Sequence, residues 1–333
     1  MKKFSSLILF LSLVGYSFSS KLTEIQYRNE FTSWMSRNQR SYASEEFITR
    51  YSTFKSNLDF INQWNSKGSE TILGLNKFAD ITNDQYRENY LSEPFDSLSS
   101  PLIHIKKEGE EVSKNNGVDW RKQGAVSSVK NQIGGCGSWP LSAIGATESA
   151  HFLANQKDHL VSLSEQNLID CSNLNKPCYQ GKVNEAFQYI IDAGGIDTEE
   201  SYPFNGGERG KCNYNSSNSG ASLSSYKKVI SGSESSLESA VSLKPVATYI
   251  DASCLSFQFY SSGIYYEASC SSTDLNLSVL VVGYDSSSSS SDSKYWIVQN
   301  SWGTSWGEDG YILMSKDRGN NCGISTMAFY PIV

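Results

Sequence analysis

Positive charge is in short supply in this chain. Its 333 residues include 28 Lys and Arg against 35 Asp and Glu, which gives a formal net charge of −7. Proteins whose main partner is nucleic acid or an anionic membrane present basic patches, so both partner classes are disfavoured. Hydrophobic residues make up 38% of the chain and aromatic residues 12%. That share is sufficient for a packed core and argues against a disordered chain.

Histidine is also scarce. The chain has only His104, His151 and His159, and none in its second half. It also has no C-x-x-C pair and no cluster of cysteine and histidine. Structural zinc sites are built from such clusters, so a zinc site is disfavoured and no cofactor is expected.

After its first residues the chain has no apolar run long enough to cross a bilayer. The N-terminus combines Lys2 and Lys3, an apolar stretch from Leu7 to Val14, and small residues from Ser17 to Ser20. This order is typical of a signal peptide, and the apolar stretch is too short for a transmembrane anchor. We therefore predict a signal peptide at residues 1–19 and a mature protein in the secretory pathway, in a lysosome or outside the cell.

Cysteine is absent from the first 130 residues, so the N-terminal third must fold without disulfides. Export permits disulfides in the remainder. An odd number of cysteines leaves at least one thiol unpaired. The seven cysteines are Cys136, Cys171, Cys178, Cys212, Cys254, Cys270 and Cys322.

Residues 20–116 differ in character from the rest, with many charges and a helical periodicity. Six residues recur at spacings of four, four, three, four and four, which places them on one face of a helix. An arginine and two asparagines on that face are unusual for an ordinary amphipathic helix, which packs through apolar side chains. From Glu93 to Asn116 the chain becomes polar, which predicts a linker open to proteolysis. The six residues of the helix face are Glu46, Arg50, Phe54, Asn57, Ile61 and Asn65.

Residues 117–333 are rich in aromatic residues and cysteine. Helix-like patterns occupy 139–155 and 163–193, and strand-like alternation follows residue 227. A helical half followed by an antiparallel half predicts an α+β fold with two lobes. We place a mainly helical lobe at 117–226 and a mainly β lobe at 227–333. The strand-like segments are 246–250, 278–283, 295–298 and 310–313.

The segment from Asn131 to Ser142, NQIGGCGSWPLS, resembles the nucleophile region of papain-like cysteine proteases. The helix face described above and the segment Gly74–Asp80 resemble the two prosegment motifs of the cathepsin-L-like branch. The resemblance covers nearly the whole chain after the signal peptide. It implies a two-lobed papain-like fold preceded by a helical inhibitory prosegment. Further matching segments are Val118–Trp120, Ser164–Cys171, Tyr295–Trp302 and Trp306–Gly310.

The resemblance also assigns site residues. In this family a cysteine thiolate pairs with a histidine imidazolium, an asparagine orients the imidazole, and a glutamine stabilises the oxyanion. Gln132 matches the glutamine, Asn300 the asparagine, and Trp302 the tryptophan that shields it. The nucleophile position holds Ser138, and the histidine position holds Leu277, in Asn-Leu-Ser-Val where the family has Asp-His-Gly-Val.

Ser138 and Leu277 cannot form that reactive pair. A serine hydroxyl is a poor nucleophile without a base, and leucine accepts no proton. His151 lies thirteen residues along the predicted helix, about 20 Å away at 1.5 Å per residue, beyond the reach of proton transfer. Nothing in the spacing supports Lys182 as a base instead. A second alignment omits the nucleophile altogether, and neither alignment places a cysteine there.

The cleft implied by the resemblance is altered as well. It consists of Trp139, Gln180, Gly181, Val183 and Trp302. Gln180 adds a side chain where the family has a glycine that lets a peptide lie close.

The resemblance implies three disulfides, with Cys136 displaced by one residue from its usual place. Cys254 is left over, and we expect it to be an inert free thiol. The implied pairs are Cys136–Cys178, Cys171–Cys212 and Cys270–Cys322.

Two N-glycosylation sequons occur, at Asn215 and Asn276. Asn215 lies in a serine-rich loop, and we expect it to be modified. Asn276 precedes a strand on the cleft wall, and we expect it to remain bare.

These features predict a catalytically inactive papain-like protein, a pseudoprotease. We expect a monomer whose cleft binds peptides, protease inhibitors or related proteases in addition to its own prosegment, as a decoy or regulator of active relatives. One alternative is an active papain-family endopeptidase that degrades proteins by unorthodox chemistry. Another is a structural or storage protein.

Overall fold

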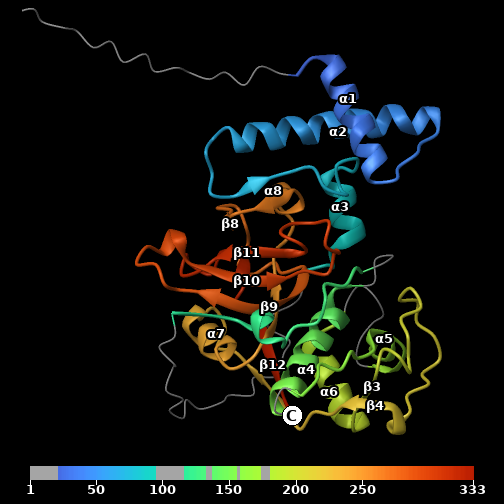
Figure 1. The fold of residues 1–333 in the computed structure, drawn as a ribbon, viewed down its shortest axis with the longest axis vertical. Coiled ribbons are helices and arrows are strands. Elements are labelled where there is room, and N and C mark those ends of the chain that lie inside the picture. The colour runs from blue at the N-terminus through green and yellow to red at the C-terminus, as the bar shows by residue number, and fades with distance from the viewer. Residues whose placement is uncertain (1–21, 95–115, 133–136, 156–157, 174–180) are drawn as a thin grey trace, which may run out of the picture.

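A computed structural model describes residues 22–94, 116–132, 137–155, 158–173 and 181–333. The predicted signal peptide and most of the predicted linker lie outside these ranges. Figure 1 shows three parts: two helices at one end, a twisted sheet in the middle, and a group of helices at the other end.

The N-terminal part consists of α1 (Glu24–Arg37) and α2 (Ser44–Asn65), followed by β1 (Ile72–Leu73) and α3 (Asn83–Tyr90). A capping box starts α1, because Thr23 and Gln26 satisfy each other's backbone N–H groups. The two long helices cross over an aromatic core in which Phe31 and Trp34 of α1 pack on Phe54 of α2, with ring centroids 5.0 and 5.7 Å from Phe54.

The mixed face predicted for residues 46–65 is explained by the chain that runs beneath α2. Asn57 Nδ2 donates to the carbonyl oxygens of Ala79 and Ile81, at 2.9 and 3.0 Å. Asn65 exchanges two hydrogen bonds with the backbone of Leu73, at 2.8 and 3.0 Å. The polar positions therefore satisfy backbone groups of an extended segment, which would otherwise be left unpaired.

The central sheet has the order β5-β12-β6-β9-β10-β11-β8, with β2 paired to β9. The pairings between its described strands are antiparallel except that of β8 with β11. Eight of the nine residues of β9 are buried, so it forms the centre of the lobe. The strands are β2 (Gly117–Asp119), β5 (Ser225–Lys228), β6 (Val246–Ile250), β8 (Ile264–Tyr265), β9 (Leu277–Asp285), β10 (Tyr295–Gln299), β11 (Tyr311–Ser315) and β12 (Ala328–Ile332).

The helical part is built on α4 (Trp139–Ala154), with α5 (Glu165–Cys171) and α6 (Val183–Ala193) beside it. Almost every side chain of α4 is buried because the helix lies between its neighbouring helices and β9. Gly145 permits this approach: a Cβ there would lie 2.9 Å from the Leu280 side chain of β9. The remaining short elements are η2 (Trp120–Gln123), β3 (Ile196–Asp197), η3 (Ser216–Asn218), β4 (Ser219–Ala221), α7 (Glu234–Val241), α8 (Leu255–Gln258), β7 (Tyr260–Ser262), η4 (Ser291–Ser293) and η5 (Asn321–Gly323).

The predicted α+β fold with a helical and a β lobe is confirmed. The helix-like stretch 163–193 divides into α5 and α6, with residues 174–180 outside the described ranges. The two lobes are not separated at a single position in the sequence. β2 lies at the start of the segment 117–226, which was predicted to form the helical lobe, but it pairs with β9 of the β lobe. None of the helices in the described ranges is both long and apolar enough to span a membrane.

The N-terminal part docks on the β lobe through backbone and side-chain contacts. β1 pairs antiparallel with β7, and the Gly74 N–H donates to the Phe259 carbonyl oxygen at 2.9 Å. Asn76 Nδ2 donates to the Gln258 carbonyl oxygen at 2.7 Å. Tyr86 is buried and its hydroxyl donates to the Ala252 carbonyl oxygen at 2.7 Å. Figure 1 shows this segment lying along α8 and continuing into α3.

Candidate active site

The nucleophile position lies where the two lobes meet. Ser138 is the residue before α4, and its Oγ accepts a hydrogen bond from the Ser278 N–H of β9 at 2.7 Å. One turn on, the Ser142 hydroxyl donates to the Val279 carbonyl oxygen at 2.8 Å. Residue 138 is thus the immediate neighbour of the 277–278 dipeptide, although 140 positions separate Ser138 from Ser278 in the sequence.

Leu277 is fully buried and belongs to the hydrophobic core. Its side chain has no atom that can accept a proton. The described histidines are elsewhere: the His151 ring hydrogen-bonds Asn155 at the far end of α4, and His159 pairs with Asp158 on the surface. His104 lies outside the described ranges.

Lys182, the other base considered, is engaged with Glu185 one helical turn away, at 3.8 Å. The pair sits at the start of α6.

Two antiparallel segments position Gln132 and Asn300. Asn131 forms a β-bridge with Trp302, and the Gln132 N–H donates to the Ser301 carbonyl oxygen at 2.8 Å. The Ser301 hydroxyl donates to Gln132 Oε1 at 2.9 Å, and the Ser301 N–H donates to Asn300 Oδ1 at 2.7 Å. Gln132 and Asn300 are therefore held as one hydrogen-bonded unit.

The Asn300 amide nitrogen has no hydrogen-bond partner among the described residues, and the side chain is only 3% exposed. The indole nitrogen of Trp302 is buried in the same way. Buried polar groups are normally satisfied. The two described histidines bond elsewhere, to Asn155 and Asp158.

Two of the residues expected in the cleft are buried. Trp139 and Val183 are both buried in the core of the helical lobe. Trp139 packs so closely on Gly181 that a Cβ there would lie 2.2 Å from the indole, and the Val183 N–H donates to the Tyr249 hydroxyl. Neither side chain therefore offers a surface to a ligand. Gln180 lies outside the described ranges.

Trp302 is buried for a different reason, because the N-terminal segment covers it. Phe78, Tyr86 and Tyr90 surround its ring edge-on, with centroids at 5.3, 5.6 and 6.3 Å. Aromatic pairs favour this edge-to-face geometry.

The same segment runs directly over the site. Gln132 Nε2 donates to the Tyr90 carbonyl oxygen at 3.4 Å, and the Ser92 N–H donates to the Asn276 carbonyl oxygen at 2.9 Å. Residues 90–92 thus contact both Gln132 and Asn276, the residue before Leu277.

With this geometry established, comparison with known proteins is decisive. Residues 114–332 match the papain family cysteine protease domain, and residues 31–86 match the cathepsin propeptide inhibitor domain. The chain belongs to the papain family. Cysteine proteinase 5 of Dictyostelium discoideum is 54% identical over 352 residues and covers 100% of both chains. Procathepsin L of Rattus norvegicus is 38% identical over 335 residues, 98% of each chain.

Solved structures agree with this assignment. Procathepsin L2 proteinase from the larval midgut of Tenebrio molitor superposes with a TM-score of 0.84 at 33% identity, covering 92% of this chain and 100% of that one. The recombinant stem bromelain precursor gives 0.81 at 34% identity, covering 92% and 99%. The N-terminal part of the chain is therefore a papain-family prosegment, bound to its own catalytic domain.

Two of the disulfides implied by the family are present, Cys171–Cys212 and Cys270–Cys322, with S–S distances of 2.07 and 2.10 Å. The third implied pair, Cys136–Cys178, falls on residues outside the described ranges. Cys254 is free and partly buried. Burial raises the pKa of its thiol to about 11, assisted by the Asp251 carboxylate.

Sequence reasoning missed a buried charge cluster behind α4. Lys130 forms ion pairs with Glu165 of α5 and, at 4.0 Å, with Glu148 of α4. The two carboxylates are only 4% and 1% exposed, and burial raises the pKa of both. Glu165 stands within the segment Ser164–Cys171 that carried the family resemblance, but its spacing from Glu148 gave no signal of contact.

It also missed Lys77, which stands inside the prosegment motif Gly74–Asp80. A lysine between two residues that become buried, Asn76 and Phe78, was the available signal. Long side chains can bury their stems while the charged end finds an acceptor.

Proposed function

We propose that this chain is a papain-family protein without peptidase activity, whose site is kept covered by its own prosegment. The observation that carries the proposal is the pairing of Ser138 with Leu277. Ser138 Oγ accepts a hydrogen bond from the backbone N–H of Ser278, the residue that follows the buried Leu277. A serine nucleophile needs a neighbouring base to take its proton, and none of the groups found in contact with Ser138 can do so.

The frame around this pair supports a loss of chemistry in a retained fold. Gln132 and Asn300 remain in one hydrogen-bonded unit, and the shielding Trp302 remains beside it.

An inactive chain cannot cut off its own prosegment. We propose that the prosegment, residues 20–116, stays attached to the papain-like domain, residues 117–333, until another protease cuts between them. The freed cleft would then bind peptides, protease inhibitors or the prosegments of related proteases, and so regulate active relatives. We place the protein in the secretory pathway, with residues 1–19 as its signal peptide.

The second candidate is an active endopeptidase. It is favoured by the names of the relatives, which are cysteine proteinases and procathepsin L, and by the retention of Gln132 and Asn300. The two proposals differ in one measurable property, which is hydrolysis by the chain after the prosegment has been removed.

The test uses the full chain with a cleavage site for an added protease engineered between residues 95 and 115. After cleavage and removal of the prosegment, the wild type is assayed on a peptide substrate and with a thiol-directed epoxide probe. We expect no hydrolysis above that of Ser138→Ala and no labelling. Hydrolysis that disappears in Ser138→Ala would establish the active endopeptidase instead.

A gain-of-function variant tests the same idea in the other direction. Ser138→Cys with Leu277→His rebuilds the reactive pair, and we expect it to be labelled by the epoxide. Ser138→Cys alone is the matched control, because a thiol without a neighbouring imidazolium keeps a high pKa and reacts slowly. Equal labelling of the single and double variants would show that position 277 does not face position 138 as the histidine does in the family.

A further inference from the structure

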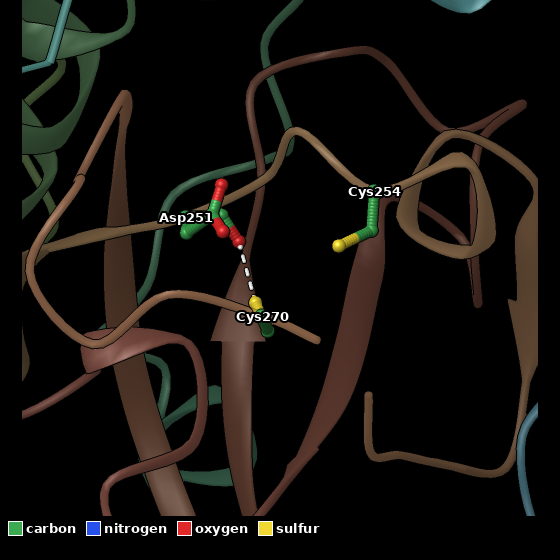
Figure 2. A group of neighbouring side chains, drawn as sticks. All are labelled: Asp251, Cys254 and Cys270. Atoms are coloured by element: carbon green, nitrogen blue, oxygen red, sulfur yellow. Dashed lines mark hydrogen bonds between the residues drawn. The ribbon is translucent and has the colours of Figure 1, made fainter. Parts of the chain in front are cut away.

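A second reactive group lies in the β lobe, away from the site described above. Cys254 is the residue before α8, and its thiol points toward Cys270 (Figure 2). The Cys254 Sγ, the Cys270 Sγ and a carboxylate oxygen of Asp251 all lie within 4.8 Å of one another. Cys270 is itself joined to Cys322 by a disulfide. A free thiol therefore stands next to a disulfide bond.

A metal site is the first function to consider for two sulfurs and a carboxylate. It does not fit, because a metal requires a thiolate and Cys270 has none while it is bonded to Cys322. The Asp251 carboxylate is also occupied: Oδ1 accepts from the Ser253 N–H and from Asn276 Nδ2, both at 2.9 Å, and Oδ2 accepts from the Ser271 N–H at 2.8 Å.

We propose that Cys254 and the Cys270–Cys322 disulfide form a thiol–disulfide exchange centre that sets how tightly α8 holds the prosegment. This inference stands whether or not the chain is an active peptidase.

The exchange is balanced within the chain. The Cys254 thiol gives up its proton, and the thiolate attacks Cys270 Sγ. The Cys270–Cys322 bond breaks as the Cys254–Cys270 bond forms, and Cys322 leaves as a thiolate that takes up a proton. No external oxidant or reductant is consumed, because one disulfide and one thiol are present before and after the step.

The leaving residue is held in an unusual conformation. Cys322 is fully buried in η5. Its backbone φ is +54°, in the left-handed region that residues other than glycine and asparagine rarely adopt. Such a conformation costs about 1–3 kcal/mol and persists only where the surroundings enforce it. Release of Cys322 removes one of the constraints that enforce it, which favours the exchanged form.

The exchange reaches the prosegment through α8, which is four residues long. Its last residue, Gln258, accepts hydrogen bonds from Asn76 Nδ2 at its main-chain oxygen and from Asn83 Nδ2 at its side-chain oxygen, at 2.7 and 3.0 Å. The new bond requires the sulfurs of Cys254 and Cys270 to approach to about 2.05 Å. Closing that gap pulls on the start of α8 and thereby disturbs the contacts at its end.

The rate should be governed by the thiolate. With a thiol pKa of about 11, the thiolate fraction, and with it the exchange rate, rises about tenfold per pH unit below that value. The centre is therefore nearly silent in an acidic compartment and active in an alkaline one or in the presence of a small thiol that catalyses exchange.

The first experiment follows the bonds in the full-length protein. It is held at pH 7, 8 and 9, quenched in acid, alkylated in denaturant, and mapped by peptide mass spectrometry. We expect the Cys254–Cys270 pair and alkylated Cys322 to appear in the wild type, about tenfold faster for each pH unit, while Cys171–Cys212 stays intact. Cys254→Ser should keep Cys270–Cys322 alone. Alkylation confined to Cys254 at every pH would overturn the proposal, as would scrambling that also involves Cys171–Cys212.

The second experiment tests the effect on the prosegment. In Cys322→Ser the thiols of Cys254 and Cys270 are oxidised to the exchanged bond by added oxidised glutathione, which takes up the two electrons and two protons. Cys254→Ser with Cys322→Ser, treated in the same way, is the matched control that lacks this bond. Both variants lack the native disulfide, so they differ only in the new bond. We expect amide hydrogen exchange across residues 72–83 to be several-fold faster in the single variant. Equal exchange in the two variants would refute a link between this centre and the prosegment.

Discussion

The ammonium group of Lys77, in the prosegment, donates a hydrogen bond to the main-chain carbonyl oxygen of Trp302 at 2.8 Å. A second bond joins it to Asn131 Oδ1 at 3.1 Å. Asn131 and Trp302 belong to the two antiparallel segments that position Gln132 and Asn300. One prosegment side chain therefore ties together both strands of the site's frame.

Lys77→Met should weaken prosegment docking. The substitution keeps most of the apolar stem but removes both hydrogen bonds. It also removes the ammonium group, whose nitrogen lies 5.1 and 5.6 Å from the ring centroids of Phe78 and Tyr90. Burial lowers the pKa of Lys77 to about 8, so the group is still charged at pH 7 but carries a desolvation cost that offsets part of the gain. We expect a loss of about 1 kcal/mol, seen as roughly fivefold faster hydrogen exchange across residues 72–92.

The control for this variant is Lys67→Met, which removes an exposed lysine from the same prosegment. It should leave the exchange of residues 72–92 unchanged. If Lys77→Met and Lys67→Met behaved alike, the two hydrogen bonds would contribute nothing to docking.

Glu165→Gln should flatten the dependence of stability on pH. Burial raises the pKa of Glu165 above its ordinary value of 4.5, so between that value and its raised pKa the folded protein binds a proton that the unfolded chain does not. The free energy of unfolding therefore falls as pH rises through this window. Glutamine removes the titration, and we expect the loss of stability between pH 5 and pH 7 to shrink by on the order of 1 kcal/mol.

Urea unfolding midpoints of the two proteins at pH 5 and pH 7 measure this difference. Glu88→Gln, at an exposed position of α3, is the control and should keep the slope of the wild type. A parallel pH dependence in wild type and Glu165→Gln would mean that Lys130 holds Glu165 ionised throughout.

Much of the fold could be predicted because local patterns and tertiary demands coincide. The alternation at 246–250 became β6, and the helical face at 46–65 became α2 with Phe54, Asn57 and Ile61 buried. The two asparagines of that face were recognised as unusual, but their purpose depends on the backbone of residues 73–81, which no periodicity within the helix can reveal.

The residues of the candidate site could not be predicted from local patterns in this way. Ser138 and Leu277 were identified by resemblance alone, since spacing along the chain cannot bring together residues in separate lobes. The burial of Trp139 and Val183 could not be read from the sequence for the same reason: it depends on contacts with Gly181 and Tyr249, which are distant in the sequence or in a different element. The buried contacts of Lys130 with Glu148 and Glu165 likewise arise only when α4 and α5 are packed side by side.

The two glycosylation sequons should behave differently, and the structure supplies the reason. Asn215 is exposed at the start of η3, where its side-chain oxygen accepts from the Ser217 N–H at 3.1 Å. Asn276 is only 7% exposed, and its amide is used on both sides: Nδ2 donates to Asp251 at 2.9 Å and Oδ1 accepts from the Ala252 N–H at 2.8 Å. A glycan on Asn276 would have to break the bond to Asp251 and force apart a packed loop, whereas one on Asn215 would extend into solvent.

For protein expressed through a eukaryotic secretory pathway, we therefore expect Asn215→Gln to remove one glycan from the intact mass. Asn276→Gln should leave the glycan mass unchanged while lowering the thermal midpoint, because it disturbs two buried hydrogen bonds. Loss of a glycan in Asn276→Gln would show that modification precedes the folding of this loop and that the loop tolerates it.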